Sequence, residues 1–135
     1  MSTPSQWEHF SLEELTCRCG CGLVAMDNAF MARLVRIRKK AGVPMPVSSG
    51  FRCIAHDQAV GTSSEPGGGP HTLGRAVDIL IAGEALFVVL LAALETGFQG
   101  IGLRQDGPWP GRFLHLDDIQ KAELVAIPRP RIWTY

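Results

Sequence analysis

The stretch that decides the fold is His71-Thr72-Leu73-Gly74-Arg75-Ala76-Val77-Asp78-Ile79, which follows the glycine run Gly67-Gly68-Gly69-Pro70. A histidine and an aspartate stand seven residues apart in it, with a glycine between them and an apolar run after them. From Arg75 to Ile81 the side chains alternate as in a strand, with Ala76, Asp78 and Leu80 on one face and Val77, Ile79 and Ile81 on the other. Two polar side chains at the mouth of a buried strand, beside a glycine loop, suit a metal site.

The segments around this stretch predict an α+β domain. Ser11 and Glu14 have the spacing of a capping box, and a short helical turn is expected to end near Leu15. Asp27 is expected to cap a helix that runs to about Lys40, and residues 83–96 to form a second, apolar helix. Short strands are expected at 47–52, 98–103 and 112–117, a helical turn at 53–61 and a glycine-rich loop at 62–70. Since no domain boundary is visible, we expect one domain spanning residues 1–135.

Composition limits the classes of function. The 135 residues carry 13 basic and 13 acidic side chains, so the formal net charge is zero and gives no electrostatic footprint for nucleic acid or an anionic membrane. The basic cluster within residues 33–40 fits the solvated side of a helix. The longest apolar run is too short to span a membrane, and the N-terminus lacks the pattern of a signal peptide. We expect a monomer that is made in the cytoplasm and either works there or acts on the cell wall if other means deliver it.

Four cysteines stand at positions 17, 19, 21 and 53. The segment Cys17-Arg18-Cys19-Gly20-Cys21 alternates too tightly for a C-x-x-C zinc knuckle or redox pair. Three interpretations stay open: a disulfide between Cys53 and one of the other three, a small structural metal site, and buried free thiols.

Two histidines, His71 and His115, stand where strand, loop and glycine patterns converge. His115 and Asp117 are expected to point to the same face of one strand. A catalytic zinc ion takes about three protein ligands and keeps one position for water, and both histidine and aspartate are suitable ligands. His71, Asp78 and His115 are therefore the candidate ligands, although a lone histidine is more often an ordinary core or surface residue.

Three separated motifs stand in a defined order along the chain: Ser49-Gly50-Phe51-Arg52, then His71-x-x-Gly74-x-Ala76-x-Asp78, then Phe113-Leu114-His115-Leu116-Asp117. The opening from His9 to Cys21 and the ending Arg131-x-Trp133 extend the pattern over nearly the whole chain. Together these motifs resemble the M15 peptidase family, which comprises zinc D-alanyl-D-alanine carboxypeptidases and related murein endopeptidases, phage lysins among them.

The resemblance implies the small α+β fold that is shared with the hedgehog signalling domain, with a short antiparallel sheet and two main helices. It implies Zn2+ as the cofactor, held by His71, Asp78 and His115. Arg52 matches the arginine that grips a carboxylate of the peptide substrate, and a guanidinium fork suits that task. The implied reaction is hydrolysis of a stem or cross-link peptide of peptidoglycan by metal-activated water, as a carboxypeptidase or an endopeptidase.

Two positions depart from the pattern of the family. Gly69 stands where many members have a serine, and Ser63 or Ser64 is the candidate replacement. Arg112 stands where better-known members have a glutamate or an aspartate as general base. The nearest carboxylate is Asp117, which is expected either to act as the base or to orient a metal ligand or a neighbouring backbone group.

Two other carboxylates, Asp106 and Asp118, are weaker candidates for the base and are expected to be solvated surface charges. Two other classes of function stay open. One, which Arg112 favours, is a non-catalytic, zinc-bearing module that binds cell-wall peptides. The other is a structural protein, such as a part of a phage virion, with a vestigial site.

Overall fold

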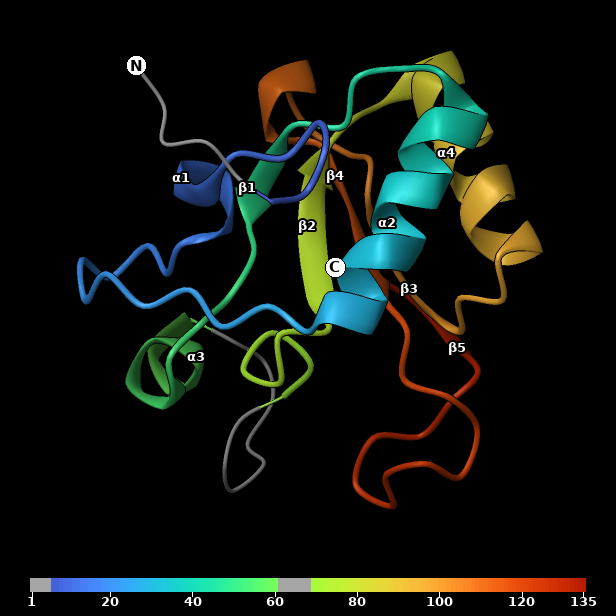
Figure 1. Cartoon of the computed structure of the whole chain (residues 1–135). Coiled ribbons are helices and arrows are strands. Elements are labelled where there is room, and N and C mark those ends of the chain that lie inside the picture. Colours follow the sequence, from blue (N-terminus) through green and yellow to red (C-terminus); the bar gives the residue numbers. More distant parts are fainter. Residues whose placement is uncertain (1–5, 61–68) are drawn as a thin grey trace.

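A five-stranded sheet forms the centre of the computed structural model, which describes residues 6–60 and 69–135 (Figure 1). The strands lie in the order β1 (Val47–Ser49), β2 (Ala76–Leu80), β4 (Phe113–Asp117), β3 (Gly100–Arg104) and β5 (Arg131–Thr134). Neighbouring strands are antiparallel except β3 and β5, which run parallel. The expected α+β class is therefore confirmed.

Helices begin and end where local sequence signals place them. Within the described residues, the α-helices are α1 (Leu12–Leu15), α2 (Asn28–Ala41), α3 (Ile54–Val60) and α4 (Gly83–Glu95), and a short 3-10 turn, η1, spans Trp109–Gly111. Ser11 and Glu14 form the expected capping box of α1. Asp27 caps α2 by accepting a hydrogen bond from the Phe30 N–H at 2.9 Å, and Gly42 ends this helix with a φ of 69°.

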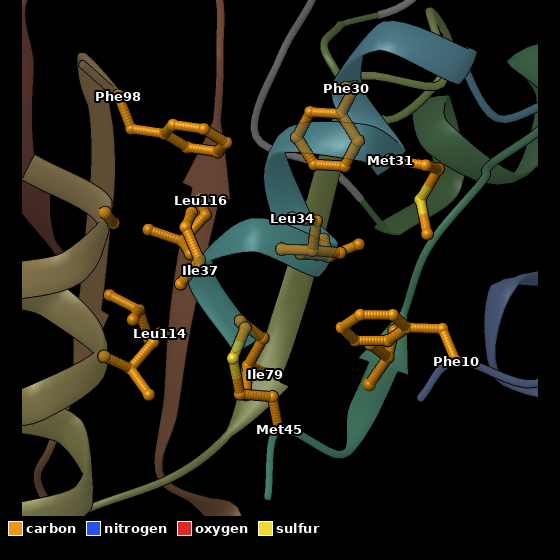
Figure 2. Packing of buried hydrophobic residues seen from close by; sticks show 14 of the residues in the cluster. Phe10, Phe30, Met31, Leu34, Ile37, Met45, Ile79, Phe98, Leu114 and Leu116 are labelled. Carbon is orange, nitrogen blue, oxygen red and sulfur yellow. The ribbon is translucent and has the colours of Figure 1, made fainter. Parts of the chain in front are cut away.

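The core lies between the sheet and the two long helices, α2 and α4. Phe30, Leu34 and Ile37 of α2 point toward Ile79 of β2 and Leu114 of β4 (Figure 2), and all five side chains are fully buried. Burying one such side chain stabilises the fold by about 1.5–3 kcal/mol. Because side chains alternate along a strand, the residues between these apolar positions, such as Asp78 and His115, face the other side of the sheet.

The C-terminal tail corrects the sequence prediction. No strand was expected after residue 117, yet Arg131–Thr134 forms the edge strand β5, in register with Gly100–Leu103 of β3. Ile132, Trp133 and Thr134 are residue types that favour strands, but prolines at 128 and 130 obscured the signal. In addition, β1 is shorter than expected and ends at Ser49.

Two further findings bear on the sequence expectations. Within the described residues, none of the helices combines the length and the apolar character that crossing a membrane requires. Most of the glycine-rich loop at 62–70, with Ser63 and Ser64, lies outside the described residues, so the proposed serine replacement is not tested.

Gly74 holds the turn before β2 against the segment that leads into α2. Its φ is +70°, and its carbonyl oxygen accepts a hydrogen bond from the Asp27 N–H at 2.9 Å. A Cβ at this position would lie 2.1 Å from the carbonyl oxygen of Ala25, which is backbone and has little room to move. Only glycine fits both the conformation and the space.

We therefore predict that Gly74→Ala lowers the free energy of unfolding by about 3 kcal/mol, because backbone strain and a steric clash add together. Chemical denaturation measures the change. Gly107→Ala is the matched control, because Gly107 has a φ of +74° and a Cβ there meets nothing within 4 Å. That control isolates the cost of the left-handed backbone, about 1 kcal/mol. Equal losses in the two variants would contradict the proposed clash.

Candidate metal centre and its pocket

One row of paired residues crosses the sheet and carries two of the candidate ligands. Ser49 of β1 pairs with Asp78 of β2, and Asp78 pairs with His115 of β4. His115 pairs in turn with Gly102 of β3, which lies opposite Trp133 of β5. Because directly paired residues project to the same face, Asp78 and His115 lie side by side opposite the α2–α4 core.

The third candidate ligand, His71, comes from the turn before β2. Its carbonyl oxygen accepts hydrogen bonds from the backbone N–H groups of Gly74 at 3.2 Å and Arg52 at 3.3 Å, which tie the turn to the segment after β1. The His71 and His115 rings lie edge to face, with centroids 5.2 Å apart, and both are buried. The structure therefore brings His71, Asp78 and His115 together, as the sequence predicted.

Each histidine has one ring nitrogen bound by the protein and the other directed at Asp78. The Nδ1 of His71 lies 2.7 Å from the carbonyl oxygen of Gly50, and its Nε2 lies 3.4 Å from the Oδ1 of Asp78. The Nε2 of His115 lies 2.7 Å from the Oδ2 of Asp117, and its Nδ1 lies 3.0 Å from the Oδ1 of Asp78. Since a carbonyl oxygen only accepts, Nδ1 of His71 carries the proton and leaves Nε2 as a lone-pair donor.

These three donors fit a zinc ion. Their ligand atoms all lie within 4.8 Å of one another. Ligands of a tetrahedral zinc ion at 2.0–2.1 Å stand about 3.3 Å apart, which is close to the distances seen here. Each histidine also has the hydrogen-bonded outer nitrogen that is typical of zinc-binding histidines.

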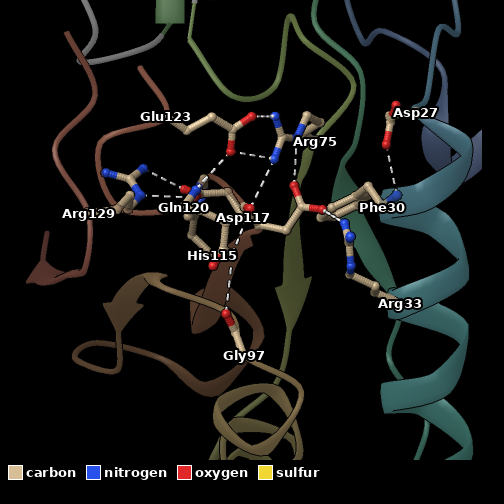
Figure 3. A network of polar contacts seen from close by, with 11 residues as sticks. Asp27, Phe30, Arg33, Arg75, Gly97, His115, Asp117, Gln120, Glu123 and Arg129 are labelled. Carbon is tan, nitrogen blue, oxygen red and sulfur yellow. Dashed lines mark hydrogen bonds and ion pairs between the residues drawn. The ribbon is translucent and has the colours of Figure 1, made fainter. Parts of the chain in front are cut away.

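Asp117 is fully buried and lies between Arg129 and His115, which both bind its carboxylate (Figure 3). Its Oδ1 accepts a hydrogen bond from the Nε of Arg129 at 2.9 Å, and its Oδ2 accepts one from the Nη2 of Arg129 at 2.6 Å. The same Oδ2 faces the Nε2 of His115. The two arginine bonds form a bidentate ion pair, the strongest form of this contact.

Two glycines in β3 make room for this arrangement. A Cβ at Gly100 would lie 2.0 Å from the Oδ1 of Asp117, and one at Gly102 would lie 2.8 Å from the Trp133 ring and 3.0 Å from the Cβ of His115. The pattern Gly-Ile-Gly therefore leaves one face of β3 empty for its neighbours, while Ile101 fills the core on the other face.

Burial by itself favours the neutral forms of these groups, but their partners outweigh it. Beside the two histidines, the pKa of Asp78 is held well below its usual range. The pKa of Asp117 is lowered by His115 and Arg129. The two carboxylates raise the pKa of His115 to about 9. A metal ion held at the Nδ1 of His115 would therefore take the place of a proton.

Arg52 lies beside the candidate ligands, and its guanidinium already binds two carboxylates of the protein. Its guanidinium donates to the Oδ2 of Asp78 at 3.1 Å and to the Oδ1 of Asp57 at 3.3 Å, and its Nε donates to the Oγ of Ser49 at 3.2 Å. The other oxygen of Asp57 accepts from the Gly69 N–H at 3.0 Å. A guanidinium has five N–H donors, so two remain for a ligand in the pocket.

A pocket of about 510 Å3 opens over these residues. His71, Asp78 and His115 line it, and Arg52 and Asp57 form part of its wall. The tail supplies further lining residues that the sequence patterns did not assign to the site: Arg129, Arg131, Trp133 and Tyr135. They follow each other with a period of two, and this alternation was the signal in the sequence for an edge strand that faces the site.

The surroundings of Asp118, Asp106 and Arg112 bear on the identity of the general base. Asp118 was expected to be a solvated surface charge, but it is buried and binds both Arg33 and Arg75. This prediction was wrong, because the two arginines that neutralise Asp118 come from distant segments. Asp106 is exposed, as expected. Arg112 donates from its Nε to the carbonyl oxygen of Gly107 at 3.0 Å and lies over the Trp109 ring.

Comparison with known proteins agrees with the motifs. A family model described as Peptidase M15 matches residues 8–117. No curated protein and no solved structure matches the chain. The matched span includes His71, Asp78 and His115 and ends at Asp117, before the tail that supplies Arg129.

We predict that Arg129→Met lowers the free energy of unfolding by about 3–5 kcal/mol at neutral pH, because it leaves the buried Asp117 carboxylate without its cation. The lowered pKa of Asp117 stabilises the native protein above 3.8, the ordinary pKa of aspartate, and this contribution is lost as the pH falls through the native pKa. The difference between variant and wild type should therefore shrink in acid.

Denaturation at a series of pH values measures this difference. Arg131→Met is the matched control, because the neighbouring Arg131 is exposed and contacts the Trp133 ring. The control should unfold like the wild type. An Arg129→Met variant with wild-type stability at neutral pH would contradict the assigned ion pair.

Proposed function

The chain belongs to the peptidase M15 family, and we propose that it is a zinc-dependent peptidase that cleaves stem or cross-link peptides of peptidoglycan. The observation that carries the proposal is the convergence of two histidine nitrogens and one carboxylate oxygen at the floor of a pocket. His71 and His115 offer nitrogen through Nε2 and Nδ1, and Asp78 offers oxygen.

The protein's own residues prepare this ligand set. Bound zinc supplies a Lewis acid that polarises a peptide carbonyl and lowers the pKa of water. The carbonyl oxygen of Gly50 holds the His71 ring, and Arg52 holds the second oxygen of Asp78. Such contacts fix the direction of each ligand before a metal binds.

We assign Asp117 as a positioning residue that acts through His115. Its carboxylate is buried, its oxygens are hydrogen-bonded to Arg129 and His115, and it does not line the pocket. A general base needs to reach the proton that it removes. The contacts of Asp117 therefore support the orienting role over the role of base.

Charge in the pocket supports a substrate that carries carboxylates. Four arginines line it, Arg52, Arg104, Arg129 and Arg131, against two aspartates, Asp57 and Asp78. Arg129 is bound to Asp117, which leaves the other three guanidiniums facing the pocket with donors to spare. Arg52 is nearest to the ligands and is the residue that we propose grips the substrate carboxylate.

The second candidate function, a zinc-bearing module that binds cell-wall peptides without cleaving them, also has an observation in its favour. Among the described residues, the carboxylates that line the pocket are Asp57 and Asp78. Asp78 belongs to the ligand set, and Asp57 is bound by Arg52 and the Gly69 N–H. In the described part of the pocket, neither carboxylate stands free to act as a base.

Digestion of purified sacculi tests the main proposal. Wild-type protein with zinc should release peptides that mass spectrometry identifies, and the masses show which bond is cut. His71→Ala and Asp78→Ala should lose both bound zinc and hydrolysis, as should wild-type protein treated with a chelator. Undiminished hydrolysis after zinc removal would contradict the proposal. Binding to sacculi without any released peptide would establish the module instead.

Replacing Asp117 separates positioning from base catalysis. We predict that Asp117→Asn lowers zinc affinity by about 10–100-fold. The neutral amide of the variant holds the His115 ring less firmly than the ionised carboxylate of Asp117 does. Competition with a chromophoric chelator measures the affinity, and restoring zinc saturation should restore most of the activity. Asp106→Asn, at an exposed carboxylate, is the control and should change neither quantity. Unchanged zinc affinity together with lost hydrolysis would identify Asp117 as the base.

A further inference from the structure

Four cysteine side chains meet at a second place in the fold. The sulfur atoms of Cys17, Cys19, Cys21 and Cys53 all lie within 4.8 Å of one another. Cys17 follows α1, Cys19 and Cys21 lie in the glycine turn after it, and Cys53 directly precedes α3. All four are free cysteines, and Cys17 is buried while Cys19 and Cys21 are exposed.

The spacing of the sulfur atoms discriminates between the interpretations that the sequence left open. The Sγ of Cys19 lies 3.5 Å from that of Cys17 and 3.6 Å from that of Cys53. A disulfide requires about 2.05 Å. Sulfur ligands at 2.3 Å from a tetrahedral zinc ion stand about 3.8 Å apart, close to the distances observed. The cluster therefore has the dimensions of a tetrathiolate site rather than of a disulfide.

The backbone is arranged to present these sulfur atoms. Gly20 and Gly22 have φ values of +92° and +78°, which let the chain reverse between and after the cysteines. The Cys17 N–H donates to the carbonyl oxygen of Leu23 at 2.9 Å and closes the turn. The Cys53 N–H lies 3.4 Å from the Sγ of Cys17, as a donor does beside a metal-bound thiolate.

Arg18 fastens the turn to the rest of the molecule. Its guanidinium donates to the carbonyl oxygens of Glu13 at 2.7 Å and Glu14 at 3.0 Å. It also donates to the carbonyl oxygens of Ser48 at 3.0 Å and Val47 at 3.3 Å, both in β1. The side chain between the first two cysteines thus binds the N-terminal segment to the strand that leads to Cys53.

We propose that Cys17, Cys19, Cys21 and Cys53 bind one structural zinc ion, separate from the ion held by His71, Asp78 and His115. Four thiolates in tetrahedral arrangement favour zinc over harder cations such as magnesium and calcium. With all four positions filled by protein, the site has none open for water, which is the mark of a structural site. The inference stands on the sulfur geometry and does not depend on the proposed peptidase activity.

Zinc at this position would affect the pocket, because one of its ligands stands next to Arg52. Cys53 is the neighbour of Arg52, whose guanidinium reaches Asp78 and Asp57. The strand before it, β1, has three residues and provides a short anchor. Zinc bound at Cys53 therefore fixes the backbone of the arginine that faces the pocket to the N-terminal turn.

Cobalt substitution tests the proposal by spectroscopy, because only a sulfur ligand gives a thiolate-to-cobalt charge-transfer band. Wild-type protein loaded with Co2+ should bind two metal ions per chain, one for each group of ligands, and should show this band. His71→Ala combined with Asp78→Ala should bind one ion and keep the full band. Cys19→Ser and Cys21→Ser, at exposed positions, should reduce or abolish the band and leave the His/Asp site loaded.

A thiol count completes the experiment. All four thiols should be protected from a thiol reagent in zinc-loaded wild-type protein, and all should react after a chelator removes the metal. The absence of the charge-transfer band in folded wild-type protein would overturn the proposal, whatever the cysteine variants do. So would a disulfide found by mass spectrometry, or four thiols that react at once while zinc is present. Absence of the band from wild-type protein that still hydrolyses sacculi would reject this site and leave the peptidase proposal standing.

Discussion

The pairing of β2 with β4 is the constraint on which the site depends. In this antiparallel register Asp78 lies directly opposite His115, and Val77 lies opposite Leu116 in the core. A shift by one residue would turn the ligands into the apolar core and the core residues into the pocket. The hydrophobic packing of α2 and α4 on one face therefore specifies the position of the polar row on the other. Folding of the sheet therefore also brings Asp78 and His115 side by side.

The polar groups at the pocket form a chain of contacts in which each side chain holds the next. Arg129 holds Asp117, Asp117 holds His115, and His115 and His71 converge on Asp78. Each buried charge thus has a partner of opposite sign, which offsets the cost of its burial. The glycines of β3 provide the volume for these side chains. The tail contributes Arg129, where this chain of contacts begins, although the tail lies outside the span matched by the family model.

Much of this could be predicted from local patterns. The capping residues Ser11 and Asp27 predicted the starts of α1 and α2, and the alternation around Asp78 and His115 predicted β2 and β4. The predictions failed where a distant partner decides the outcome. Asp118 was predicted to be a surface charge because its partners, Arg33 and Arg75, are far from it in the sequence. The edge strand β5 was missed because its prolines resemble a loop, and only pairing with β3 makes it a strand.

The sequence by itself predicted which residues would carry the chemistry: His71, Asp78 and His115 with Arg52 beside them, in motifs whose order and spacing resemble one family. It did so because ligand types, strand alternation and turn glycines are local properties of the chain. Only the tertiary structure decided what those residues contact. It showed Asp117 enclosed by Arg129 and His115, brought four cysteines from two segments together, and turned the tail into a wall of the pocket. These outcomes depend on contacts between segments far apart in the chain, which local patterns do not encode.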